Sequence, residues 1–468
     1  MNCTCRRNAS TARRRRTSCR HRGRTTPRPI LPIRSRRRRP MASVIDSPPS
    51  RTAVQKLLAR AAGRTHVEVG EVVYPEPDLV TIHDGFSEGA YRELSALGYR
   101  ALRHPERIMF VTDHEVAYSS PAAVSRGTVI RDISKRWDIG HFFDVGRGGH
   151  GHLFPIENGM VRPGMVVFSY DMHCTTFGAV GALAFGVGPE VTTVLATGTL
   201  WTQVPATIRV DLVGRLPRGS HARDVGFVLT KGLAENRWAV DYDYRVIEFG
   251  GPGAETFDLA GRVALCNSVT ELGIASVLFD VAPPDVERAQ FAAFASDPHA
   301  AFEARIEIDL GQIEPQVALP GGPENAVPVG DAKGRPIQHA FIGSCGSGMY
   351  EDFADAAALL RGRRIADGVR MFIVPGSVQT AQRLAGDGLS QIFMEAGAML
   401  LPSGCGPCAN GLMAPLGTGE VSISTAAINH SGRFGAPGGE PYLGSPLTVA
   451  ASALAGRIVD PRDYVDTI

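Results

Sequence analysis

Helices and strands alternate along most of this sequence, and this alternation predicts an α/β protein. The chain has 468 residues, which is enough for about three domains of ordinary size. Its hydrophobic content of 44% is ordinary for a globular protein. Changes in composition, and a stretch dense in proline and glycine, predict a basic tail at residues 1–50 and three domains at 51–206, 207–322 and 323–468.

The net charge of the chain combines two regions of opposite character. The formal net charge is +2, but residues 1–40 hold fifteen arginines and no acidic residue. The remainder holds 34 basic and 47 acidic residues, which is a net charge of −13. We therefore expect an acidic body that does not attract nucleic acid, except through the tail. No run of 18 or more apolar residues occurs, so we expect no membrane span.

The tail at 1–50 is too charged and too poor in apolar residues to form a core, and we expect it to be disordered. An Arg-rich, Ser-rich and acid-free segment fits an organellar transit peptide or a nucleic-acid-binding arm. A third interpretation is a start codon placed too far upstream, with Met41 as the true first residue. We favour the third, because no amphipathic helical pattern is visible. An N-terminal mass measurement on natively expressed protein decides between them.

The eight cysteines are scattered along the chain, and they are few for its length. This usage argues against a disulfide framework and for a reducing compartment. We expect a cytoplasmic protein, or one in an organellar matrix if residues 1–40 are a transit peptide.

The first domain should contain strands whose ends carry polar side chains. A helix at 54–63 and a second at 87–98 flank short strands that lead to His83. An apolar strand from Ile108 delivers Asp113 and His114 at its tip, and a strand at 165–170 feeds the polar turn that holds Asp171 and His173, with a helix of small residues behind it. Open α/β sheets place ligands at such carboxyl ends of strands.

The second and third domains repeat the alternation. The expected elements are a strand from Thr207, a helix at 222–235, a segment at 261–279 that carries Cys266, Asn267 and Glu271, a strand and connector at 303–329, helices at 350–362 and 377–388, and strands at 370–376 and 397–402. We find no internal repeat.

Three cysteines of the last domain suggest a metal centre. Cys345 follows the apolar run 340–343, which is typical of the end of a buried strand, and Cys405 and Cys408 are spaced C-x-x-C in a turn rich in glycine and proline. Three thiolates from two loops suit a soft metal, and an iron–sulfur cluster is the leading candidate. A cluster with three protein sulfurs leaves one iron open to act as a Lewis acid. The spacing alone also allows buried thiols or a redox pair.

Short motifs between Thr52 and Ile468 occur in a characteristic order. They are His-Asp-Gly at 83–85, Asp-His-x-Val at 113–116, Gly-His at 151–152 with Glu-x-Gly at 157–159, the Asp-x-His-x-Thr turn at 171–175, LATGTLW at 195–201, Cys-Asn-x4-Glu at 266–271, the three cysteines, and YLGSP at 442–446. On these motifs the chain resembles the aconitase superfamily, and within it the large subunits of 3-isopropylmalate dehydratase and similar homoaconitase-like proteins.

The resemblance implies three α/β/α domains packed around a central iron–sulfur cluster. It implies that Cys345, Cys405 and Cys408 hold a 4Fe–4S cluster with one iron that has no protein ligand. The remaining site residues that it implies are Asp113, His114, His152, Asp171, His173 and Glu271 for catalysis, His83 and Arg433 for substrate binding, and Asn267 for cofactor binding. Taken without the resemblance, Asp113–His114 could be a solvated loop pair and His152 could cap a turn. His150 has no counterpart in the motif, and we expect it to face solvent.

Several positions depart from the family pattern. Gly346 and Ser347 follow Cys345 where relatives have Thr-Asn, and Ala427 and Ile428 stand in place of Asn-Arg. The arginine lost at Ile428 clamps a substrate carboxylate in relatives, because its fork suits carboxylates. Met172 also replaces a serine, and Phe177 a histidine. A lost charged hydrogen bond is worth roughly 1.5–3 kcal/mol, so a more apolar pocket predicts a substrate other than isopropylmalate, in a specialised biosynthetic pathway.

The resemblance also implies a function and a partner. We expect a hydro-lyase of the leucine-biosynthetic type, which dehydrates and rehydrates a small 2-hydroxy di- or tricarboxylic acid. The family's proton-abstracting base is a serine on a swivelling fourth domain, so we expect a separate small subunit that carries this domain. The alternatives are an RNA-binding, iron-sensing relative without hydro-lyase activity, and an inactive scaffold subunit, against which the three retained cysteines argue.

Overall fold

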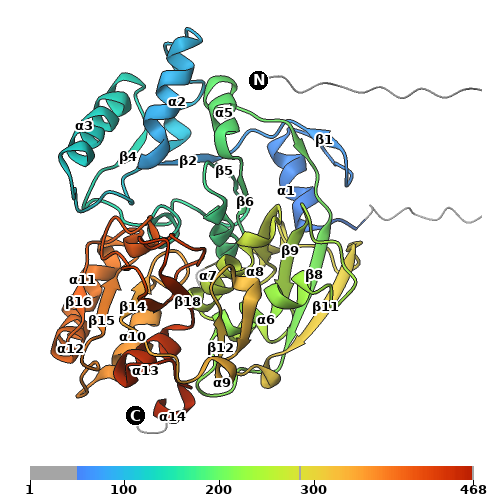
Figure 1. Cartoon of the computed structure of the whole chain (residues 1–468). Coiled ribbons are helices and arrows are strands. Elements are labelled where there is room, and N and C mark those ends of the chain that lie inside the picture. The colour runs from blue at the N-terminus through green and yellow to red at the C-terminus, as the bar shows by residue number, and fades with distance from the viewer. Residues whose placement is uncertain (1–49, 284–285, 466–468) are drawn as a thin grey trace, which may run out of the picture. The chain divides into compact units, whose positions relative to one another are not determined.

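Three sheets of mainly parallel strands organise the computed structural model, which describes residues 50–283 and 286–465 (Figure 1). Helices alternate with these strands along the chain, so the predicted α/β class is confirmed. The predictions for the basic tail and for Met41 concern residues outside this described part. Within it, no helix is both long enough and apolar enough to cross a membrane.

The first sheet is fully parallel and has the strand order β4-β3-β2-β5-β6. Its strands are β2 (Leu79–His83), β3 (Ile108–Val111), β4 (His141–Phe143), β5 (Val166–Ser169) and β6 (Leu183–Gly186). Its helices are α1 (Ala53–Ala61), α2 (Asp84–Ala96), α3 (Pro121–Arg136), α4 (Phe154–Glu157) and α5 (Val191–Thr197), and β1 (Val72–Val73) pairs with β7 (Thr202–Gln203) beside it. The chain order reverses between β2 and β5, and a ligand crevice is expected outside such a switch point.

The second sheet is also parallel and has the order β10-β9-β8-β11. Its strands are β8 (Thr207–Val213), β9 (Val246–Gly250), β10 (Ser276–Phe279) and β11 (Ala304–Asp309), and its helices are α6 (Ala222–Ala234), α7 (Leu259–Ser268) and α8 (Arg288–Ala292). One hydrophobic core joins it to the first sheet, because Leu79, Phe177 and Ile208 belong to the same buried cluster.

The third sheet is mixed, with the order β13-β12-β18-β17-β14-β15-β16. Its strands are β12 (Gln316–Ala318), β13 (Ala326–Pro328), β14 (His339–Gly343), β15 (Arg370–Val374), β16 (Met399–Leu400), β17 (Val421–Ser424) and β18 (Glu440–Leu443). Its helices are α9 (Val329–Ala332), α10 (Tyr350–Leu360), α11 (Val378–Gly386), α12 (Leu389–Ala396), α13 (Pro446–Ala455) and α14 (Arg462–Val465). Strand β12 pairs antiparallel with β13 and β18, and the other pairs are parallel.

Polar residues fix where the main helices begin. The side chains of Thr52, Ser120, Ser377 and Ser445 each accept a hydrogen bond from a backbone N–H in the first turn that follows. Such caps satisfy N–H groups that have no partner inside the helix. The three predicted domain ranges stay a prediction, because the described residues form one compact unit.

A charged network lies in the second sheet. The Arg209 guanidinium donates to Glu248 at 2.7 Å and to Asp211 at 2.8 Å, and it also pairs with Asp280. Glu248 is fully buried, and the side chain of Arg209 is 12% exposed. An uncompensated buried charge is costly, so the stability of this sheet depends on the arginine.

We expect Arg209→Met to lower the free energy of unfolding by about 3–5 kcal/mol, because it leaves Glu248 buried without its cation. Denaturant unfolding monitored by circular dichroism measures the shift in midpoint. Arg305→Met is the matched control, since the Arg305 side chain is 54% exposed and also pairs with Asp211. This control should change stability by about 0–1 kcal/mol, and equal shifts in the two variants would contradict the prediction.

Candidate active site

The ends of strands from the first and third sheets meet at one buried cavity. β2 ends at His83, β3 leads to Asp113, β5 leads to Asp171, and β14 leads to Cys345. The residues that line this cavity are His83, His114, His150, His152, Asp171, His173, Ser344, Cys345, Cys405, Cys408 and Arg433. Most of the predicted site residues therefore lie together.

Asp113 holds two of the histidines. Its carboxylate is fully buried, lies 2.9 Å from Nδ1 of His83 and 2.8 Å from Nδ1 of His114, and accepts from the Gly151 N–H at 2.8 Å. Burial opposes the ionisation of Asp113, but the charges on the two histidines outweigh it, and the pKa of Asp113 lies well below its usual value.

His114 is held by two carboxylates. Its Nδ1 also lies 2.9 Å from Asp84, whose other oxygen accepts from the His114 N–H. Burial lowers the pKa of His114, but the negative charge of Cys405 in its ionised form and the charge of Asp113 outweigh this effect, so the pKa of His114 lies well above its usual value. Because Nδ1 is engaged, a proton given by His114 would leave from Nε2.

His83 and His152 form a chain that runs from Asp113. Their Nε2 atoms lie 3.1 Å apart. Burial lowers the pKa of His83, but Asp113 reverses the shift and raises it, whereas burial holds the pKa of His152 well below its usual value. A protonated His83 therefore donates to a neutral His152. The Nδ1 of His152 is buried and has no partner among the described residues, so this N–H can bind a ligand.

His173 lies between two carboxylates. Its Nδ1 is 3.0 Å from Asp171 and its Nε2 is 2.7 Å from Glu271. Burial lowers the pKa of His173, but the charge of Asp171 and the negative charge of Cys345 in its ionised form outweigh this effect, so the pKa of His173 lies well above its usual value. Burial raises the pKa of Asp171, but the charge of His173 outweighs this effect and holds it well below its usual value. The arrangement fixes an imidazolium with both nitrogens paired.

The backbone positions the three sulfurs. Ser344, directly before Cys345, has φ +63°, a left-handed conformation that costs free energy in a non-glycine residue. Cys405 and Cys408 lie in a short 3₁₀ turn, where Gly406 takes φ +63°. The Cys405 N–H donates to the Asp113 carbonyl at 2.8 Å, which ties this turn to the first sheet.

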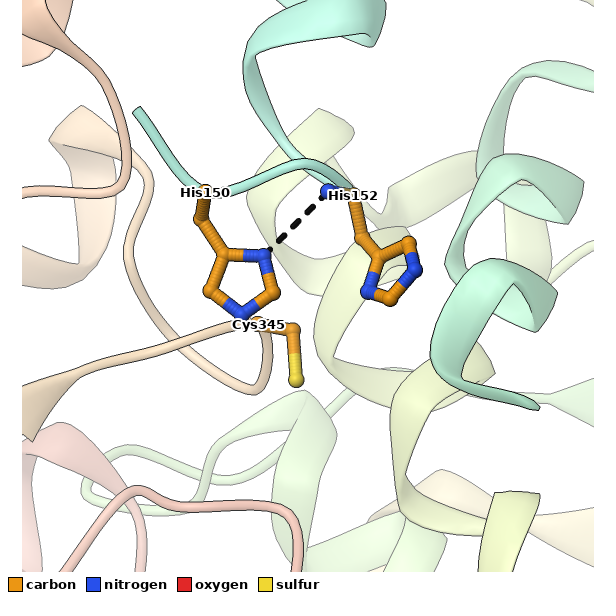
Figure 2. A group of neighbouring side chains, drawn as sticks. All are labelled: His150, His152 and Cys345. Carbon is orange, nitrogen blue, oxygen red and sulfur yellow. Dashed lines mark hydrogen bonds between the residues drawn. The ribbon is translucent and has the colours of Figure 1, made fainter. Parts of the chain in front are cut away.

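The donor set fits an iron–sulfur cluster better than a single ion. Among the described residues, the sets of ligand atoms within 4.8 Å of one another mix histidine, aspartate and at most one cysteine; His150, His152 and Cys345 form one such set (Figure 2). All three sulfurs nevertheless line the same cavity. A cluster takes each sulfur on a different iron, so it accommodates this separation. Burial raises the pKa of the Cys345 and Cys405 thiols, and metal binding must therefore displace their protons.

Three polar side chains lie close to the cysteines. The Arg433 guanidinium is 3.9 Å from the Cys408 sulfur and 3.4 Å from Asn410 Oδ1. Asn267 is 1% exposed, and neither polar atom of its amide has a partner among the described residues. Arg223, which the sequence did not single out, is equally buried, and burial lowers its pKa to about 10. Its Nε and Nη1 also have no partner in the described part of the chain. Unpaired buried donors are expected beside an anionic cofactor.

The absence of a side chain at Gly346 makes room for this arrangement. A Cβ there would lie 2.3 Å from Arg223 Nη1, 2.5 Å from the Thr425 carbonyl oxygen and 3.1 Å from Asn267 Oδ1. The departure from the family's threonine is therefore matched by the close approach of Arg223. A buried arginine on an amphipathic helix carries no signal in the sequence that predicts this contact.

The prediction that His150 faces solvent is wrong. His150 is 3% exposed and lies in the cavity. Its N–H donates to the Gly376 carbonyl at 2.7 Å, and the Val378 N–H donates to the Gly148 carbonyl at 2.9 Å, which turns the segment inward. Residues 150–153 form a turn, in which the Leu153 N–H donates to the His150 carbonyl at 2.9 Å, so no regular period in the sequence predicts where this ring points.

Carboxylate-paired histidines that face three buried cysteines define the site of an enzyme that combines acid–base chemistry with a metal centre. The model of the aconitase family (aconitate hydratase) matches residues 55–336 and 330–456. The chain belongs to the aconitase family, and it is a hydro-lyase.

Two relatives that are similar in sequence agree with this assignment. The chain is 36% identical over 425 residues to the 3-isopropylmalate dehydratase large subunit 1 of Methanopyrus kandleri, a match that covers 89% of this chain and 100% of the relative. It is 36% identical over 415 residues to the homoaconitase large subunit of Thermus thermophilus, which covers 88% of this chain and 97% of the relative. A solved structure, the holo-form of Thermococcus kodakaraensis aconitase X, matches 80% of this chain and 89% of its own with a TM-score of 0.49 and 12% identity.

We expect Asp113→Asn to lower the pKa of both His83 and His114, because the carboxylate that raises them is removed. Histidine-selective NMR titration of the metal-free protein measures both values. Asp132→Asn, on the exposed face of α3, is the control and should leave them unchanged. Unchanged titration in Asp113→Asn would contradict the assignment of Asp113 as the group that holds the histidines protonated.

Proposed function

We propose that this chain is the large subunit of a hydro-lyase that dehydrates and rehydrates a small 2-hydroxy di- or tricarboxylic acid similar to 3-isopropylmalate. The observation that carries the proposal is that three cysteine sulfurs and three carboxylate-paired histidines, His83, His114 and His173, line one buried cavity. Membership of the aconitase family supports it, as do relatives that are named dehydratase and homoaconitase large subunits.

Cys345, Cys405 and Cys408 would hold a 4Fe–4S cluster, with one iron that has no protein ligand. When bound, this group supplies a Lewis acid that polarises the hydroxyl of the substrate. Arg223 and Asn267 would lie near the cluster, since each has an unpaired polar atom close to Gly346, which directly follows Cys345.

The histidines of this chain manage the proton of the departing hydroxyl. His114 gives a proton from Nε2, while Asp113 and Asp84 hold its Nδ1 and keep the imidazolium stable. Asp171 and Glu271 hold both nitrogens of His173, so this residue orients and stabilises charge. The Nδ1–H of His152 is free to bind an oxygen of the substrate, and His83 supports it from the side of Asp113.

The carboxylate of the substrate is expected to meet Arg433. Ile428 stands where relatives have a second arginine, and it packs against the apolar cluster that contains Cys408 and Phe434. One cationic clamp instead of two favours a substrate that offers an apolar group at this place. The preferred substrate is therefore a 2-hydroxy diacid other than isopropylmalate.

A small subunit with the swivelling fourth domain would complete the site and supply the base that removes the proton next to a carboxylate. The two relatives cited above are each named a large subunit, which supports a two-subunit enzyme. We propose that the enzyme is cytoplasmic, because the reducing environment there keeps the three thiols from forming disulfides.

The experiment that tests the proposal measures kcat/KM over a panel of 2-hydroxy diacids, with the chain reconstituted anaerobically with iron, sulfide and its co-encoded small subunit. We expect the enzyme to hydrate or dehydrate at least one compound of the panel. We also expect at least one compound to be a better substrate than isopropylmalate. No turnover of any member by a fully loaded enzyme would contradict the proposal, and best turnover of isopropylmalate would contradict its substrate preference.

In the same assay, Ile428→Arg should raise kcat/KM for isopropylmalate by about ten-fold or more, because a charged hydrogen bond to carboxylate is worth roughly 1.5–3 kcal/mol. The control is Ile428→Met, which keeps the pocket apolar and should leave the preference unchanged. If the two variants, at equal iron content, have the same ratio of kcat/KM for isopropylmalate to kcat/KM for the other diacids, Ile428 does not set specificity.

A further inference from the structure

His150 is a buried residue that lines the cavity, and it has no role in the chemistry proposed above. It precedes the Gly-His motif of the family and has no counterpart in it. The imidazole is 3% exposed, and its ring nitrogens lie near the cluster cysteines: one belongs to the set within 4.8 Å of Cys345 and His152, and one to the set within 4.8 Å of Cys405 and Asp113. It therefore lies close to a sulfur from each of the two cysteine loops.

The backbone holds His150 in place from two sides. The His150 N–H donates at 2.7 Å to the carbonyl of Gly376, which follows β15 of the third sheet, and Gly149 forms a β-bridge with Ser377. Gly149 has φ +135°, and a Cβ there would lie 2.4 Å from the Gly376 carbonyl oxygen, so only glycine allows this approach. The Gly376 N–H in turn donates to the Gly348 carbonyl at 2.8 Å, which connects this segment to the loop after β14 that carries Cys345.

The tautomer of His150 follows from one hydrogen bond. Its Nδ1 accepts the backbone N–H of His152 at 3.2 Å (Figure 2). An accepting Nδ1 carries no proton, so the neutral ring carries its proton on Nε2. In Figure 2 this second nitrogen lies on the side of Cys345. An Nε2–H is a donor and has no lone pair for a metal.

We propose that His150 donates a hydrogen bond from Nε2–H to the sulfur of Cys345 or to the adjacent sulfide of the cluster, and so raises the reduction potential without binding an iron. The inference rests on the proposed cluster. Donors to the sulfurs stabilise the extra negative charge of the reduced cluster, which makes reduction easier. Because His150 is a donor and no ligand, it leaves the fourth iron open for substrate.

The test compares variants of the reconstituted two-subunit enzyme. In His150→Gln the side-chain amide N–H can take the place of Nε2–H, in His150→Asn the amide lies near Nδ1, and in His150→Leu no donor remains. Midpoint potentials come from anaerobic redox titrations monitored by electron paramagnetic resonance, with iron and sulfide content measured for each protein. His104→Leu, which removes a half-buried histidine beside Glu106, is the control for the loss of a histidine.

We expect His150→Leu and His150→Asn to shift the midpoint potential to more negative values, and His150→Gln and the control to stay at the wild-type value. If His150→Leu does not hold a cluster, the comparison of Gln with Asn carries the test. Equal potentials in all loaded variants would overturn the inference and leave the proposed function intact. A wild-type chain that assembles no cluster would instead reject the proposed function, and this inference with it.

Discussion

The carboxylate of Asp113 is the group on which the rest of the site depends. The carboxylate binds His83, His114 and the Gly151 N–H, and the backbone carbonyl of the same residue accepts a hydrogen bond from the Cys405 N–H. Asp113, which follows β3, thereby connects two histidines, the segment that carries His150 and His152, and the cysteine turn that packs beside the third sheet. The fully buried carboxylate is tolerated because the two histidines and the Gly151 N–H compensate it.

The constraint explains why the site is built from strand ends. Parallel strands bring their carboxyl ends to one edge, so residues as far apart in sequence as His83 and Asp171 need no long loops to meet. The third sheet adds Cys345 in the same way, after β14. The remaining two cysteines come from a turn, where glycine permits the left-handed angle that points two sulfurs inward.

Much of this could be predicted from the sequence. The apolar run before Cys345, the C-x-x-C turn and the strand that ends at Asp113 are local patterns, and the structure has them where they were expected. The motif order predicted the family, which the comparisons confirm. The family's functions for individual side chains stay predictions, because geometry shows which groups meet and not what they do in turnover.

Other features could not be predicted, because they arise where separate segments of the chain meet. The inward turn of His150 depends on a hydrogen bond to Gly376, more than two hundred positions away. The burial of Arg223 depends on the missing side chain of Gly346 and on the backbone of the segment after β17. Periodicity within one segment contains no information about such contacts.

The central claim is that three sulfurs share one polynuclear cofactor beside the carboxylate-paired histidines. The most direct measurement is the ratio of iron and acid-labile sulfide to protein in anaerobically purified enzyme. The account predicts about four irons and about four sulfides per chain. A single iron or zinc without sulfide, as a mononuclear site at His150, His152 and Cys345 would bind, would contradict it.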